Sequence, residues 1–199
     1  MTRNGSAVNQ PDLDLEELTE LPPRKLSEAL GWCERSLGAH RGDCELLVSE
    51  AYRRSTGKEL TRLEIYLNPT TELLTVARET LFEFVKARRA GTPIQYVVGY
   101  QQFLENRYEV GPGVLVPRPE TEAFCARVIR SLRAQPVEPR FGLEVCLGSG
   151  ALSVELLLAF SRLTMRATEI SDKARVYAER NATRILGPVG RARLEILTP

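Results

Sequence analysis

The chain has 199 residues, and its 27 Lys and Arg residues nearly balance its 26 Asp and Glu residues. This length permits one sizeable hydrophobic core or two small ones. Because the charges are balanced, we expect no basic surface for direct nucleic acid binding. No apolar run approaches the roughly 20 residues of a membrane span, and the first residues lack the pattern of a secretory signal. The sequence therefore predicts a cytoplasmic protein without a membrane segment.

The four cysteines and the one histidine do not form a recognisable ligand or nucleophile pattern. Cys33, Cys44, Cys125 and Cys146 show no C-x-x-C spacing, and His40 has no second histidine in the sequence. Zinc sites need such residues in clusters, and a thiol nucleophile needs a histidine base nearby. We therefore expect no metal site and four buried, reduced thiols.

The first part of the chain is predicted to be a mobile tail followed by a helical domain. Residues 1–23 are polar and end at two prolines, which favours a mobile tail. From residue 24 to residue 90, apolar residues recur at helical spacing. Thr61 and Glu64 have the spacing of a capping box, and Asn68-Pro69 is typical of the start of the next helix. This domain contains no evident catalytic residue, so core packing explains its apolar pattern best.

Residues 91–118 are predicted to connect the helical domain to the rest of the chain. Phe103 to Val110 and Gly113 to Val116 can pair as a hairpin around Gly111-Pro112-Gly113. A helix is then expected from Thr121 to Leu132, with one apolar face pointing inward. That face comprises Phe124, Val128, Ile129 and Leu132.

Strands and helices alternate in the last part of the chain, from residue 119 to residue 199. Alternation at this spacing predicts a parallel sheet with helices on its faces. Ligands of such sheets bind at the carboxyl ends of the strands. The predicted strands are Leu143 to Leu147, Met165 to Ile170 and Ala192 to Leu197, and the predicted helices are Ala151 to Phe160 and Lys173 to Leu186.

A Gly-rich turn and an acidic residue lie where that ligand crevice is expected. Gly148 and Gly150 permit a tight turn and leave room for a ligand, and the helix from Ala151 presents unpaired N–H groups that favour an anionic group. Glu169 ends the next strand about twenty residues later, where a carboxylate can accept hydrogen bonds from ribose hydroxyls. The lack of a following Lys-Ser/Thr excludes a P-loop, and the missing third glycine disfavours a nicotinamide site. The alternative is a tight turn that binds no ligand.

Several motifs together resemble one family. They are Gly91-Thr92-Pro93-Ile94-Gln95-Tyr96-Val97-Val98-Gly99, Phe103, Pro117-Arg118-Pro119-Glu120-Thr121-Glu122, the Gly-rich turn, Glu169-Ile170-Ser171 and Asn181. Between Asp43 and Leu197 the chain resembles the HemK/PrmC family. These are S-adenosylmethionine-dependent methyltransferases that modify the glutamine of the GGQ motif in peptide chain release factors. The Pro-Arg-Pro-Glu-Thr-Glu block is the specific part, since many nucleotide enzymes carry a Gly-rich turn.

The resemblance implies an α/β fold. A small N-terminal helical domain would precede a β-hairpin connector and a partial, doubly wound Rossmann-like methyltransferase sheet with its first three parallel strands, the first of them at one side. It also implies methyl transfer from S-adenosylmethionine to a glutamine side-chain nitrogen without metal. The partner would be a release factor, and the complete protein would be a monomer. The residues that would bind S-adenosylmethionine are Cys146, Leu147, Gly148, Ser149, Gly150 and Glu169, with Phe103 and Thr121 facing the same crevice.

The chain departs from the family pattern at two places. The usual Asp-x-Gly-x-Gly-x-Gly turn is here Glu144-Val145-Cys146-Leu147-Gly148-Ser149-Gly150. Cys146 can replace the first glycine if it keeps a negative φ, and Leu147 removes a possible hydroxyl contact. The Asn-Pro-Pro-Tyr motif that orients the substrate amide is absent, because the only Asn-Pro is the helix start at Asn68-Pro69. We therefore assign no catalytic residue.

We expect a fragment, or a chain truncated in evolution, that holds the cofactor half of such an enzyme and is catalytically inactive by itself. The strand Leu143 to Leu147 would be an open edge, with Val145, Leu147 and Val154 partly exposed and the free chain prone to associate. Two alternatives stay open. One is a glutamine methyltransferase acting on a ribosomal protein, and the other is a non-catalytic remnant that binds protein through its helical domain.

Overall fold

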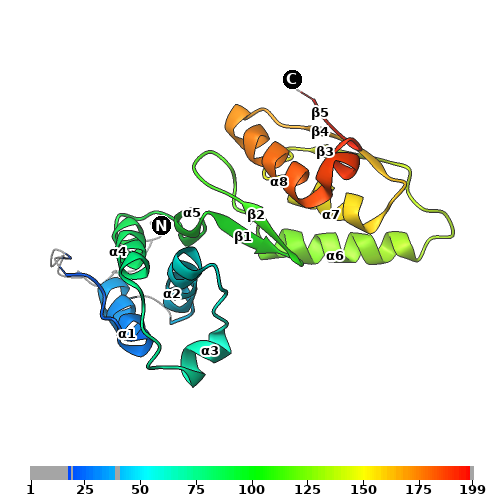
Figure 1. Ribbon diagram of the computed structural model, residues 1–199. Coiled ribbons are helices and arrows are strands. Elements are labelled where there is room, and N and C mark those ends of the chain that lie inside the picture. The colour runs from blue at the N-terminus through cyan, green and yellow to red at the C-terminus, as the bar shows by residue number, and fades with distance from the viewer. Residues whose placement is uncertain (1–17, 19, 39–40, 198–199) are drawn as a thin grey trace, which may run out of the picture. The chain divides into compact units, whose positions relative to one another are not determined.

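The computed structural model describes the chain except for residues 1–17, 19, 39–40 and 198–199 (Figure 1). Most of the tail predicted over residues 1–23 and the single histidine, His40, therefore lie outside the described residues. The chain divides into two compact units, the first ending at Thr92 and the second beginning at Pro93. The domain boundaries expected after residues 23, 90 and 118 stay predictions.

The first unit is helical, and its helices pack around a core of apolar side chains. Leu26 and Cys33 from the first helix, Leu47 from the second, and Leu81 and Val85 from the fourth are all buried. The apolar spacing in the sequence thus marks the faces that pack together. The helices are α1 (Leu26–Leu37), α2 (Arg41–Thr56), α3 (Arg62–Leu67) and α4 (Thr75–Arg89).

The start of α4 differs from the expectation. The predicted capping box is present, since Thr61 and Glu64 cap each other at the start of α3. Asn68, however, ends α3, and α4 begins only at Thr75. The intervening chain is held by backbone hydrogen bonds to the entry of α1, where the N–H of Leu26 donates to Thr71 at 2.9 Å and Leu73 donates to Arg24 at 2.7 Å. A turn at Pro69-Thr70 comes first, and these bonds then hold the following residues beside Lys25 instead of in a helix.

The second unit opens with a short helix, α5 (Ile94–Val98), and a β-hairpin of β1 (Tyr100–Phe103) and β2 (Asn106–Glu109). The hairpin pairs Phe103 with Asn106, so the predicted pairing with Gly113 to Val116 is wrong. Val110 and Val114 instead pack against Ala174, beyond the hairpin. Ala174 lies in the helix Asp172–Arg191, and packing against this helix keeps residues 113–116 out of strand pairing.

Helix α6 (Pro119–Arg133) follows, close to the predicted range. Val128, Ile129 and Leu132 pack against the core of the unit as expected. Phe124 is exposed, and its neighbour Cys125 takes the buried position. The inward position predicted for Phe124 is therefore wrong by one residue.

The predicted parallel sheet is confirmed. Its strands are β3 (Phe141–Val145), β4 (Thr164–Thr168) and β5 (Leu194–Leu197), in the order β3-β4-β5 with both pairings parallel. The expected position of the first strand at one side is thus also confirmed. The connections are helix α7 (Ala151–Ala159) and helix α8 (Asp172–Arg191), which is interrupted at Gly187.

Within the described residues, α7 and α8 cover only one face of this sheet. Met165, Ala167 and Leu194 point to that face and join one core cluster with Val154 and Ala178 from the helices. Strand order β3-β4-β5 runs in one direction, and right-handed crossovers then place both helices on the same side. Helices on both faces, as the alternation suggested, would need a reversal of that order.

The other face of β3 is open in the described part of the chain. Phe141, Leu143 and Val145 are 59%, 61% and 68% exposed. The exposure predicted for Val145 is thus confirmed, but Leu147 and Val154 are buried, so that prediction is wrong for them. Both belong to the covered side, where α7 packs. No helix among the described residues is long and apolar enough to cross a bilayer.

Candidate functional site

The Gly-rich turn joins the carboxyl end of β3 to the N-terminus of α7. The N–H of Leu147 donates to the carbonyl of Thr168 at 2.9 Å, and the N–H of Gly150 donates back to Leu147 at 3.0 Å. Gly148 and Gly150 both have positive φ, of 60° and 84°, which glycine adopts at low cost. A Cβ built on Gly148 would meet nothing within 4 Å, so this part of the turn borders open space.

Glu169 is bound directly to this turn. Its Oε2 accepts a hydrogen bond from the N–H of Gly148 at 2.8 Å, and its Oε1 accepts one from the N–H of Ser171 at 2.9 Å. The side chain of Arg175 donates to the carbonyl of Glu169 at 2.9 Å, which fixes the end of β4. The predicted meeting of Glu169 with the Gly-rich turn is therefore present. Each carboxylate oxygen keeps a second lone pair for another donor.

The side chain of Asn181 in α8 fixes the Gly-rich turn by hydrogen bonds, and the sequence analysis did not predict this role. Its Nδ2 donates to the carbonyl of Ser149 at 3.0 Å and to the carbonyl of Glu109 at 3.1 Å. Its Oδ1 accepts from the N–H of Glu109 at 2.7 Å. One fully buried amide thus joins the hairpin, the turn and α8. The available signal was a polar residue between Ala178 and Ala182 on the buried face of a helix.

Cys146 departs from two expectations. Its φ is +64°, not negative, so the residue adopts a left-handed conformation that costs about 1–2 kcal/mol for a side chain with a Cβ. This is the position at which the family pattern has glycine. Its thiol is exposed, whereas Cys33, Cys44 and Cys125 are buried. The prediction of four buried thiols is therefore wrong for Cys146.

The remaining predicted site residues are less favourably placed. Leu147, Ser149 and Phe103 are buried. Phe103 packs edge-to-face on Tyr108, with ring centroids 5.9 Å apart, so its ring faces the core and not an open crevice. Thr121 is exposed in the first turn of α6, where its N–H donates to the carbonyl of Arg118 at 3.0 Å. Contacts of these four side chains with a ligand stay predictions.

Glu144 lies beneath the turn, on the covered face of the sheet. Burial raises the pKa of this carboxyl to about 7, and the nearby negative charge of Glu169 acts in the same direction. A hydrogen bond donated by the hydroxyl of Ser153 opposes the shift but does not cancel it. This carboxyl therefore titrates near neutral pH, in the strand that leads into the predicted site two residues later.

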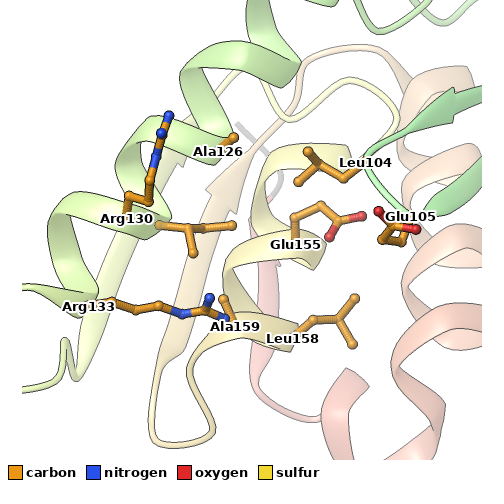
Figure 2. Close-up of a pocket in the computed structure, with 9 residues that line it drawn as sticks. Leu104, Glu105, Ala126, Arg130, Arg133, Glu155, Leu158 and Ala159 are labelled. Carbon is orange, nitrogen blue, oxygen red and sulfur yellow. The ribbon is translucent and has the colours of Figure 1, made fainter.

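A separate open hollow of about 540 Å³ lies between α6, α7 and the hairpin turn (Figure 2). Glu155 extends from α7 toward the hairpin side, which carries Leu104 and Glu105, while Arg130 and Arg133 project from α6. The Oε1 of Glu155 accepts hydrogen bonds from Tyr108 at 2.9 Å and from Asn106 at 3.0 Å, and these bonds connect the hairpin to α7. No residue of the predicted cofactor site lines this hollow. Among the described residues, no group of three His, Cys, Asp or Glu side chains could hold a metal ion.

Comparison with known proteins finds similarity to one family. Residues 28–99 match the family model of the PrmC N-terminal domain. The release factor glutamine methyltransferase of Moorella thermoacetica is 33% identical over 165 residues, which cover 80% of this chain and 56% of that protein. These matches support the resemblance of the chain to the HemK/PrmC family. The Mycobacterium tuberculosis protein of the same name is 35% identical over 171 residues, covering 83% of this chain and 52% of its own length.

The match to the HemK/PrmC family is partial in length. The chain spans about half the length of the curated relatives it matches. Among solved structures, coclaurine N-methyltransferase bound to N-methylheliamine and SAH is 17% identical, with a TM-score of 0.36 over 86% of this chain and 48% of that chain. That TM-score is too low to bear on the family or on the site.

Proposed function

We propose that this chain forms the cofactor-binding part of an enzyme that methylates a glutamine side chain of a peptide chain release factor with S-adenosylmethionine. The observation that carries the proposal is the hydrogen bond between the Glu169 carboxylate and the Gly148 N–H, at the carboxyl ends of β3 and β4. Open α/β sheets bind their ligands at this edge. The release factor is proposed as the methyl acceptor because the relatives are named release factor glutamine methyltransferases.

The residues present fit such a cofactor. Gly148 borders open space, so a ligand can approach its backbone closely. Glu169 is 8% exposed and keeps lone pairs that could accept hydrogen bonds from the two ribose hydroxyls. The first N–H groups of α7 favour the carboxylate of the methionine portion. We propose Cys146, Gly148, Gly150 and Glu169 as the principal binding residues, with the side chain of Thr121 at the edge of the site.

The cofactor, when bound, supplies an electrophilic methyl group on a sulfonium. A carboxamide nitrogen is a weak nucleophile, so the protein must contribute mainly by holding the two groups in line. The residues of this chain would hold the cofactor side of that arrangement. We assign no catalytic residue, because the Asn-Pro-Pro-Tyr motif is absent from the sequence. A cytoplasmic location and a monomeric complete protein are part of the same proposal.

The direct test is calorimetric titration of the chain with S-adenosylmethionine, in the wild type and in Glu169→Gln. The loss of hydrogen bonds to a charged acceptor should weaken binding by roughly 30- to 150-fold, or about 2–3 kcal/mol. Glu195→Gln is the matched control, because Glu195 lies on the open face of the sheet and should leave binding unchanged. Thermal unfolding of each variant checks that the fold is retained. Unchanged affinity in Glu169→Gln would remove the ribose assignment, and no binding to the wild type would remove the proposal.

A further inference from the structure

The Pro-Arg-Pro-Glu block has no part in the site described so far, yet it forms one wall of an open groove of about 560 Å³. The opposite wall comes from the start of the second unit, on α5 and β1. The whole groove thus belongs to one compact unit. Among its lining residues are Gln95, Tyr96, Gln101, Leu115, Pro117 and Arg118.

The wall is held rigidly. The hydroxyl of Tyr96 donates to the carbonyl of Val114 at 2.5 Å, which joins α5 to the segment before the block. Tyr96 and Val116 both pack against the small core cluster that includes Val114 and Ala174. Two prolines flank Arg118 and restrict the backbone further. The groove is therefore preformed rather than dependent on a ligand for its shape.

The segment that leads into the Pro-Arg-Pro-Glu block begins next to the proposed cofactor site. The hydroxyl of Ser171 donates to the carbonyl of Gly113 at 3.4 Å, and the N–H of Ser171 is bonded to Glu169. A Cβ on Gly113 would lie 2.6 Å from the side chain of Lys173, so this close approach needs glycine. The segment from Gly113 to Arg118 thus runs from the residues after β4 into the groove.

The groove has the chemistry of a site for extended polypeptide. Leu115 is 69% exposed and lines the groove, so its side chain is available for contact with an apolar side chain of a bound peptide. The carboxamides of Gln95 and Gln101 can pair with the N–H and C=O groups of a peptide backbone. Arg118 and Glu120 add one charge of each sign at the block.

We propose that this groove binds an extended segment of the acceptor protein beside the glutamine to be methylated, with Leu115 as its apolar anchor. The inference rests on the proposed function and assigns it a substrate-binding surface. The main support for this proposal is that the groove wall continues to the carboxyl ends of the strands, where the cofactor is proposed to bind. An acceptor protein must place its glutamine there while the chain on either side of that glutamine lies nearby.

The test measures affinity of the chain for a purified release factor by calorimetry, with S-adenosylmethionine affinity measured in parallel. Leu115→Asp should weaken release factor binding at least about tenfold, as expected for an apolar anchor. The double variant Gln95→Ala/Gln101→Ala should weaken it less. Val137→Asp is the matched control, because Val137 is equally exposed in the same unit but lies outside the groove, and it should bind like the wild type. All variants should keep wild-type affinity for S-adenosylmethionine.

The outcomes separate the two proposals. If Leu115→Asp binds the release factor as tightly as Val137→Asp does, the groove assignment is wrong while the proposed function stands. If the wild type binds S-adenosylmethionine but not the release factor, both the acceptor and the groove are overturned. Loss of S-adenosylmethionine binding in Leu115→Asp would show that Leu115 belongs to the cofactor site instead.

Discussion

The two faces of β3 differ although they belong to one five-residue strand. Phe141, Leu143 and Val145 point to the open face and are largely exposed, while Gly142 and Glu144 point toward the helices. The apolar residues of this strand thus lie on the face that the described chain leaves uncovered. The comparison shows that hydrophobicity alone does not determine burial. What decides is whether another element packs on that face, and here both helices pack on the other one.

The largest expected effect comes from truncating one leucine on each face. Leu194→Ala removes a buried side chain of the covered face and should cost about 2–5 kcal/mol of unfolding free energy. Leu143→Ala removes an exposed side chain of the open face and should cost less than about 1 kcal/mol. Urea unfolding of the two variants measures the difference. A loss at Leu143 as large as that at Leu194 would contradict an open face, and dependence on protein concentration would then indicate pairing of two copies through β3.

The second effect concerns the one carboxyl of β3 on the covered face. The pKa of Glu144 is raised from 4.5 to about 7, so the folded protein binds its proton more tightly than the unfolded chain does. Protonated Glu144 therefore stabilises the folded state. This contribution to the free energy of unfolding is fully present below pH 4.5 and is lost as the pH rises to about 7, by up to about 3 kcal/mol. Unfolding measured from pH 4 to pH 8 should show this decline in the wild type and not in Glu144→Gln. Glu195→Gln, on the open face, should keep the wild-type decline, and the same decline in Glu144→Gln would assign it to another group.

The smallest effect is expected at Cys146, the residue that directly follows β3. Cys146→Gly removes the cost of a positive φ but adds backbone freedom to the unfolded chain, so a net stabilisation of about 0.5–1 kcal/mol is expected. Cys146→Ser keeps the Cβ and should leave the melting temperature unchanged. Differential scanning calorimetry compares the three proteins. Equal melting temperatures for the Gly and Ser variants would show that the left-handed conformation carries no cost here.

Those parts of the fold that depend on local chemistry could be predicted from the sequence. The alternation of apolar segments gave the parallel strands, and the spacing of Thr61 and Glu64 gave a cap that is present. The position of Glu169 at the end of a strand sufficed to place it beside the Gly-rich turn. In each case the determining residues are close in sequence or follow from the handedness of strand connections.

The features that failed depend on residues far away in the sequence. The hairpin turns at Leu104, which has a φ of 49° and none of the usual turn chemistry. Gly111-Pro112-Gly113 does form a turn, in which the N–H of Val114 donates to the carbonyl of Gly111 at 3.2 Å, but this turn packs near α8 and joins no pair of strands. Pro69 looks like a helix start, but the backbone that follows it pairs with the entry of α1. Tertiary contacts override local preference at both places. The role of Asn181 was missed for the same reason, because its partners lie in other elements.

Asn181 also affects the order in which the site can form. Its amide bonds to Ser149 across 32 positions and to Glu109 across 72 positions of the chain. We expect contacts between residues so far apart in sequence to form late in folding, because the closing of a long loop costs entropy. During synthesis the Gly-rich turn leaves the ribosome before α8 does, so it emerges without the amide that fixes it. We therefore expect the nascent chain to become competent for S-adenosylmethionine only after α8 has been made and has packed beneath the turn.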